Sequence, residues 1–391
     1  MDRQPHEDDD GSDLDDGSRR LPFGGALTEA FYGALSAEVE RQLAEGRDPR
    51  ELAERVTKLD MKRMLESTSG STYSTLLDRL PQHIEYLSKG ADALQAEMRE
   101  VWGAADDLYQ AASYLGFKIG ANISESLRVK GPKMSAILGA HGRALRVAGE
   151  VRLLAMSGFG GGASARWRSL HDLTVLCAVL NEADEGISKR YLAFKHIEVF
   201  KDMLVYQEHV AALGYPPYTD AEVSASKARY DSVRAEWGPE MSKSQGWAFP
   251  LFPGAKKVDF ADLEQLAGLA YLRPFYKLGN NFVHAGPHGA ALNMRIHLTE
   301  GTRLINTGAT VFQDIAETCH GAMISLHQAT VNLVASNLKE SRGAVVDLLV
   351  GLKAQGQFVD DGGDAWGAAA VVARSRGWFT HKPSTATEGR E

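Results

Sequence analysis

The stretch EYLSKGADALQAEMREVWGAADDLYQAA (residues 85–112) indicates that this chain is built from α-helices. Alanine, leucine, glutamate, glutamine and methionine fill much of it, and these residue types have high helix propensity. We predict a long helical stretch from Leu76 to about Tyr114. Pro81 should interrupt it, because proline lacks the amide hydrogen that a helix interior requires.

The residues before this stretch show the apolar spacing of amphipathic helices. In LTEAFYGALSAEVERQLAEG (27–46) an apolar side chain recurs at every fourth residue, and Gly46 ends the run. A second helix is expected from Asp48-Pro49, since proline suits the first helical turn. We predict an N-terminal helical region over residues 23–128, whose apolar stripes form a homodimer.

The sequence after residue 128 also predicts helices. The expected ranges are Met134–Met156, Arg166–Asn181, Ile187–Leu213, about 220–236, Phe260–His284, Thr302–Gly351 and a short helix near 366–376. No turn dipeptide lies between alternating apolar runs, and no strand–helix–strand rhythm appears. The expected fold class is all-α, a multi-helix bundle with an N-terminal helical arm.

One glycine-rich stretch, SGFGGGASA (157–165), predicts a break between two of these helices. It has neither the preceding strand nor the following Gly-Lys-Ser/Thr of a phosphate-binding loop. We interpret it as a linker or a tight turn between helices.

The charge of the chain is concentrated at its beginning. The formal net charge is −8, and residues 1–20 hold eight carboxylates against three arginines, which leaves −3 for the rest. We expect residues 1–22 to be a disordered acidic tail, residues 129–355 to form the helical core and residues 356–391 to be weakly structured. A near-neutral core excludes a strongly basic, non-specific nucleic-acid-binding protein, but it allows a local basic patch.

Two cysteines, Cys177 and Cys319, lie far apart in apolar helical surroundings, which does not suit a disulfide framework. The beginning of the chain is acidic, unlike a secretory signal, and no apolar run reaches the length of a membrane span. We expect a cytoplasmic protein without a membrane segment. No motif predicts a cofactor or a metal.

The segment ARWRSLHDLT (165–174) carries the densest set of chemically active side chains. Arg168 and Asp172 are four residues apart and share a helix face, with His171 beside them. The surrounding residues are apolar on more than one side, which indicates a central helix, and paired charges on such a helix often mark a site. A structural ion pair is the alternative interpretation. The preceding helix carries Arg143, Arg146 and Arg152 among apolar residues.

A second segment, SKRYLAFKHIEVFK (188–201), places Tyr191, Lys195, Glu198 and Asp202 along one helical stripe. A solvated charged face would explain the stripe. Alternatively, Tyr191 and Glu198 turn inward, bind substrate and meet Arg168.

A third segment, YKLGNNFVHAGPH (276–288), includes Tyr276 and Lys277 as candidate binding residues. Asn281 and His284 are three residues apart at the expected helix end, where a histidine is suited to acid–base chemistry. His284 and His288 have the spacing of a helical metal pair, but Gly286-Pro287 breaks the helix between them, so we assign His288 to binding and predict no metal. A histidine that only caps the helix C-terminus is the alternative.

Taken together, these three segments resemble a bacterial family catalogued as domain of unknown function 5677, over about residues 145–340. The resemblance rests on the order Arg168 and Asp172, then Tyr191 and Glu198, then Tyr276 followed by Asn281-x-x-His284 and a Gly-Pro turn. That family commonly has glutamate at the position of Asp172 and serine near Asn280. It implies a helical fold but no assigned activity.

The helical layout is also distantly similar to HEPN-type ribonucleases, which use an Arg-x(4–6)-His motif without a metal. Here the pairs Arg166/His171, Arg190/His196 and Arg376/His381 have that spacing, whereas Lys277 precedes His284 by seven residues. Chance alone would give about two or three such pairs in a chain with this many arginines and histidines.

Two hypotheses follow for the function. The first is a metal-independent ribonuclease acting on RNA, a toxin or phage-defence effector. His284 would be its general acid and base, Arg168 would stabilise the phosphate, Asn281 and Tyr191 would position substrate, and Asp172 would hold Arg168. The second is a non-enzymatic interaction protein, in which the same residues form a buried polar network that fixes helix register.

Overall fold

The computed structural model describes residues 36–37, 40–49, 73–74, 77–126, 131–287, 289, 295–299, 302–306, 314–338 and 345–378. The chain divides into two compact units, Met1–Asp92 and Ala93–Glu391. Helix α4 (Leu80–Ser126) crosses this boundary, so the boundary lies well before the expected one after residue 128. The expected acidic tail (1–22) lies outside the described residues, and so does nearly all of the helix expected from Asp48.

In the first unit the described residues 40–44 are helical, and the chain leaves this helix at Gly46. Gly46 has a φ of +78°, and its amide donates to the Leu43 carbonyl at 3.0 Å. A left-handed glycine that ends a helix matches the predicted end of this run.

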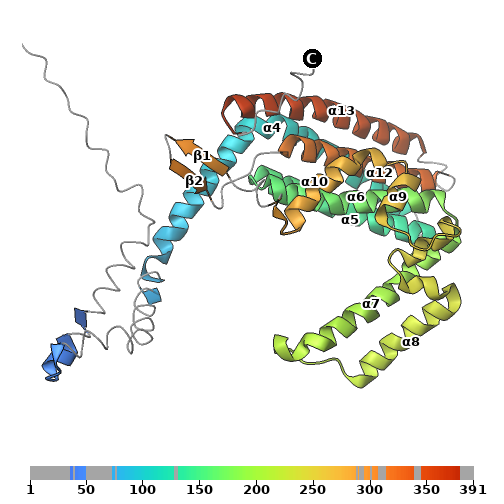
Figure 1. Ribbon diagram of the computed structural model, residues 1–391. Coiled ribbons are helices and arrows are strands. Elements are labelled where there is room, and N and C mark those ends of the chain that lie inside the picture. The colour runs from blue at the N-terminus through green and yellow to red at the C-terminus, as the bar shows by residue number, and fades with distance from the viewer. Residues whose placement is uncertain are drawn as a thin grey trace, which may run out of the picture. The chain divides into compact units, whose positions relative to one another are not determined.

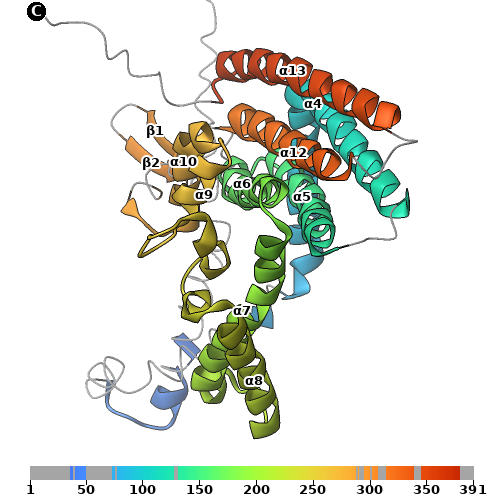
Figure 2. The same cartoon turned by 90° about the vertical axis from the view of Figure 1, so that its right-hand side faces the viewer.

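The second unit is a helical bundle, as the sequence predicts (Figures 1 and 2). Its core contains α5, α6 and α12, which contact one another, and α13 packs on α12. Their bounds are Pro132–Met156 for α5, Gly160–Glu182 for α6, Ile315–Asn337 for α12 and Val345–Ser375 for α13. The part of α4 after Ala93 joins this core through Trp102, whose ring lies 5.5 Å from that of Trp366 on α13.

The remaining elements surround α6 or extend from it. They are α7 (Glu185–Leu213), α8 (Asp220–Trp237), the 3-10 turns η2 (Pro239–Ser242), η3 (Gly246–Leu251) and η4 (Ala270–Leu272), α9 (Phe260–Leu266) and α10 (Arg273–Val283). Helices α7 and α8 form an antiparallel hairpin that extends away from the core (Figures 1 and 2). Helices α9 and α10 pack against α6.

Several predicted ranges differ from the structure. The helix expected over Phe260–His284 is divided into α9 and α10, and α4 has Pro81 in its first turn and continues past Tyr114 to Ser126. The expected helix Thr302–Gly351 is divided, because residues Thr302–Asn306 form strand β2, which pairs antiparallel with β1 (Arg295–Thr299). The expected weakly structured segment from residue 356 is instead helical to Ser375 within α13. One glycine of this segment serves packing, because a Cβ atom on Gly362 would lie 2.5 Å from Cε of Met323 on α12.

The break between α5 and α6 is shorter than the glycine-rich stretch predicts. Residues 157–159 form the turn, and Gly160 already begins α6, so the interpretation as a tight turn holds. Gly161 lies against Phe282 of α10, where a Cβ atom would come 2.6 Å from the ring. Gly279 of α10 faces α6, and a Cβ atom on it would lie 2.9 Å from Cδ of Arg168 and 3.1 Å from the carbonyl oxygen of Ser164. The two glycines therefore allow α10 to lie close to α6.

Both cysteines are buried in this unit, Cys177 on α6 and Cys319 on α12. Burial raises the pKa of the Cys177 thiol to about 12, and it raises that of Cys319 as well. Among the described helices, none combines the length and the apolar character that a bilayer crossing requires.

The position of Trp366 predicts that the C-terminal helix is part of the folding core. Trp366 is 1% exposed, so Trp366→Ala should lower the free energy of unfolding by about 3–5 kcal/mol through the cavity it creates. Urea denaturation measures this change. Val371→Ala is the matched control, because Val371 on the same helix is 63% exposed and should matter by less than about 0.5 kcal/mol. Equal, small effects of both variants would contradict this packing.

Candidate functional site

Two neighbouring recesses lie between α5, α6, α7, α9, α10 and the loop after α8. The first, about 330 Å³, contains Asp172 in its lining, and the second, about 730 Å³, contains Glu198. We call them the Asp172 recess and the Glu198 recess. Both are lined by the same four residues, Arg143, Tyr191, Gln245 and Trp247, so they form one continuous groove. The groove brings together residues from the first two predicted segments and Tyr276 from the third.

The hydroxyl group of Tyr276 links the two charged residues predicted on α6. It accepts a hydrogen bond from Arg168 Nη2 at 3.1 Å, and it also hydrogen-bonds to the Asp172 carboxylate. The Arg168 guanidinium lies over the Tyr276 ring, 4.4 Å from its centroid. Arg168 and Asp172 therefore share Tyr276 as a hydrogen-bond partner, instead of contacting each other directly as the sequence predicts.

The Asp172 side chain is accessible to water but lies within the walls of its recess. Water reaches its side chain, yet the recess walls surround it, and this loss of hydration raises the pKa of Asp172 to about 6 from an ordinary 3.8. The hydrogen bond from Tyr276 and the positive charges of Arg168 and Arg143 oppose that rise. A carboxyl group with a pKa of about 6 can exchange protons near neutral pH.

The predicted stripe on α7 forms one wall of the Glu198 recess. Tyr191, Lys195, Glu198 and Asp202 all line it, so the stripe faces the groove as a set. Loss of hydration raises the pKa of Glu198, with a further contribution from the negative charge of Asp202. Tyr191 and Glu198 face Arg143 in this groove, whereas Arg168 is not among the lining residues.

Arg143 is the cation shared by both recesses. Its positive charge acts on Asp172, Tyr191 and Glu198 alike, and it forms no hydrogen bond or ion pair with another described residue. The neighbouring Arg152 is instead bound to Asp106 at 2.6 Å. A guanidinium group without a partner among the described residues, placed near two carboxyl groups, is available to an anionic ligand.

The groove wall after α8 is held by Arg190. Its guanidinium group donates to three backbone carbonyls: Trp237 at 2.7 Å, Gly246 at 3.1 Å and Trp247 at 3.1 Å. Gln245, which directly precedes Gly246, adopts a left-handed conformation (φ 51°), and its Oε1 accepts a hydrogen bond from Trp247 Nε1 at 3.1 Å. This non-glycine residue in a strained region lies in both recesses, as strained residues at functional sites often do.

Behind the Asp172 recess lies a chain of three polar side chains, two of them fully buried. His171 Nε2 lies 2.9 Å from Glu264 Oε1, and both side chains are inaccessible to water. Glu264 is also paired with Arg273 at the start of α10. Burial lowers the pKa of His171 despite the neighbouring Glu264. This chain connects α6, α9 and α10, so it fixes the elements that carry Asp172 and Tyr276.

The other predicted residues of the third segment do not line the groove. Helix α10 ends at Val283, and His284 follows it with extended backbone angles (φ −106°, ψ 142°), so its side chain leaves the helical face shared with Asn281. His284 and Lys277 are exposed, Asn281 is half-buried, and His288 lies outside the described residues. His284 thus occupies the C-cap position, where its backbone amide donates to the Asn280 carbonyl at 3.0 Å, and capping by its side chain stays a prediction.

The arginine–histidine pairs with ribonuclease-like spacing have structural partners. Arg190 binds the three carbonyls named above, and Arg166 is paired with Glu150. Arg376 is bound to Glu100 at 2.5 Å, and its partner position, His381, lies outside the described residues. Neither Arg190 nor Arg166 is among the residues that line the groove.

Arg143, Gln245 and Trp247 were not predicted as site residues. The position of Arg143 within an apolar helix was a usable signal, but two other arginines on the same helix carried it as well. Within the described residues, no group of three or more histidine, cysteine, aspartate or glutamate side chains has the arrangement of a metal site.

Comparison with known proteins identifies one family. A model described as a family of unknown function (DUF5677) matches residues 134–301, which is less than half of the chain but includes Arg143, Asp172, Tyr191, Glu198 and Tyr276. This supports the family resemblance seen in the sequence and gives no support to the HEPN resemblance. No curated protein and no solved structure matches the chain.

The raised pKa of Asp172 predicts that this residue costs stability at neutral pH. Between pH 3.8 and 6 the folded state retains the Asp172 proton that the unfolded chain has lost, so stability falls as the pH rises through this range. Asp172→Asn should therefore raise the free energy of unfolding at neutral pH by about 1 kcal/mol, a value reduced because water reaches the side chain.

Urea denaturation at several pH values measures this difference. The gain should shrink as the pH is lowered from 7 towards 4, where Asp172 becomes neutral in the folded wild type. Glu208→Gln is the control, since Glu208 is an exposed α7 residue outside both recesses. A gain that is absent, or the same at every pH, would contradict the assigned environment of Asp172.

Proposed function

We propose that this protein is a cytoplasmic ribonuclease that cleaves single-stranded RNA by acid–base chemistry without a metal ion, acting as a toxin or phage-defence effector. The observation that carries the proposal is the Arg143 guanidinium, which has no partner among the described residues and lies in one open groove with two carboxyl groups of raised pKa. Such a set offers a proton acceptor, a proton donor and a cation for a phosphate.

The lining of the groove is suited to a nucleic-acid strand. Four cationic side chains (Arg143, Lys195, Lys201 and Lys243) stand against three carboxylates in its lining, although the whole chain is acidic. The aromatic side chains Tyr191, Trp247, Phe260 and Tyr276 lie in the Asp172 recess. Aromatic faces beside a cationic track are typical of surfaces that bind single strands.

In the proposed reaction Asp172 accepts the proton of a ribose 2′-hydroxyl group, and the resulting oxygen attacks the adjacent phosphorus. Arg143 neutralises the charge that develops on the phosphate oxygens. The bond from phosphorus to the 5′-oxygen breaks, and Glu198 gives its proton to that leaving oxygen. Tyr276 and Arg168 hold Asp172 in position. These roles replace those expected for His284 and Asn281, which do not line the groove.

The proposal is tested by RNA cleavage with the purified full chain in the presence of EDTA. Asp172→Asn should lower the rate by about 10²-fold or more, because it removes the proton acceptor. Arg143→Met should lower it by a similar factor, whereas Arg146→Met, on an exposed neighbouring turn of α5, should leave it within about twofold. The wild-type rate should rise with pH through about 6, as Asp172 ionises.

His284→Ala separates this assignment from the one based on sequence spacing. Cleavage that survives His284→Ala but not Asp172→Asn supports the groove, and the reverse result overturns it. Expression of the wild type should arrest growth of a host, and Asp172→Asn should relieve the arrest. The ribonuclease proposal would be wrong if the wild type cleaved no RNA and hosts expressing the wild type and Asp172→Asn grew equally well.

A non-enzymatic interaction protein is the second candidate. The buried His171, Glu264 and Arg190 favour it, because their hydrogen bonds go to other protein groups and fix helices and loops. In that case Asp172→Asn would raise stability without changing any activity.

A further inference from the structure

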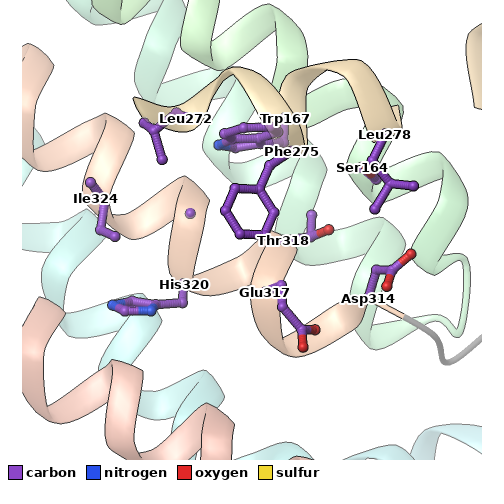
Figure 3. A pocket seen from close by; sticks show the side chains of 11 residues that line it. Ser164, Trp167, Leu272, Phe275, Leu278, Asp314, Glu317, Thr318, His320 and Ile324 are labelled. Carbon is purple, nitrogen blue, oxygen red and sulfur yellow. The ribbon is translucent and has the colours of Figure 1, made fainter. Parts of the chain in front are cut away.

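A second pocket, separate from the groove, lies between α6, α10 and the first turns of α12 (Figure 3). Its volume is about 370 Å³, within the range of small-molecule sites. The apolar part of its lining consists of Trp167, Leu272, Phe275, Leu278 and Ile324. None of these residues lines the Asp172 recess or the Glu198 recess.

Two carboxyl groups occupy one end of this pocket. Asp314 and Glu317 are three residues apart at the start of α12, and Figure 3 shows them at the end away from Leu272 and Ile324. Neither forms an ion pair with a residue that the structure describes. Loss of hydration and the charge of Glu317 raise the pKa of Asp314 to about 6, and no cation among the described residues lowers it.

The Asp314 carboxyl group also lacks the usual role of its position. Aspartate before a helix normally accepts from an amide of the first turn, but Asp314 makes no such capping bond and has a left-handed backbone (φ 64°, ψ 9°). Its Oδ2 atom is buried and has no hydrogen-bond donor among the described residues. A buried carboxylate oxygen without a donor is costly and is satisfied by a donor that binds to it.

The other polar groups of the pocket do not supply that donor. Trp167 donates its Nε1 hydrogen to Ser325 Oγ at 3.1 Å. The His320 ring points away from Phe275 and lies against Gly363 of α13, close to Asp360 and Asp364. The unmet requirement at the acidic end is therefore a positively charged hydrogen-bond donor next to aromatic surface.

We propose that this pocket binds an organic ammonium ion, with the charged nitrogen between Asp314 and Glu317 and an apolar or aromatic body against Phe275 and Trp167. The ammonium group supplies hydrogen bonds to both carboxylates and faces the Phe275 ring, which attracts cations through its electron-rich face. The apolar walls bury the rest of the ligand. The binding does not depend on the proposed ribonuclease activity.

The test uses the full chain and three probes of nearly equal shape, with binding followed by titration calorimetry at neutral pH. They are 2-phenylethylamine, which is cationic, the neutral 2-phenylethanol and the anionic 3-phenylpropanoate. The amine should bind saturably and about tenfold or more tighter than the alcohol, and the carboxylate should not bind. The proposal is overturned if the amine shows no saturable binding at concentrations up to about 10 mM, or if the alcohol binds with equal affinity.

Three variants locate the binding site. Glu317→Gln changes an exposed residue and should weaken amine binding several-fold, and Asp314→Asn combined with it should weaken binding by about tenfold or more. Glu208→Gln, which lies on α7 outside the pocket, should change nothing. Amine binding that survives the double variant would place the amine elsewhere and overturn the assignment. RNA cleavage should be the same in all three variants, so the two proposals fail independently.

Discussion

The close contact between α6 and α10 is the constraint on which the Asp172 recess depends. Gly161 and Gly279 have no side chains at the points where Phe282 and Arg168 lie, so the two helices approach to a distance that any larger residue would prevent. At this distance Tyr276 reaches both Arg168 and Asp172. The buried His171–Glu264 pair then holds α9 against the same face of α6.

The polar residues of the second unit divide into two groups with different surroundings. Arg190, His171 and Glu264 are buried and bound to protein partners, so they fix the positions of loops and helices. Arg143 and Asp172 face open space, and their interactions with the protein are electrostatic or single hydrogen bonds. The first group holds the second in place, which is the usual relation between a preorganised site and its support.

The helices were predictable from the sequence because apolar spacing and helix propensity are local properties. The same local reasoning failed in α13, where Gly362 serves a contact with Met323 that only the folded chain contains. It located Asp172, Tyr191 and Glu198 because helical spacing puts them on definite faces. It did not foresee that His284 follows the last helical residue, or that Trp247 lines the groove, since the position of Trp247 depends on bonds from the distant Arg190.

The burial of the two cysteines gives the chain a useful chemical property. Their thiols stay protonated and out of reach of alkylating reagents at neutral pH, since burial raises the pKa of both. A third cysteine introduced at exposed Lys195, on the rim of the Glu198 recess, would then be the preferred site of modification. A fluorophore attached there would report on what enters the groove, without first removing either natural thiol from the core.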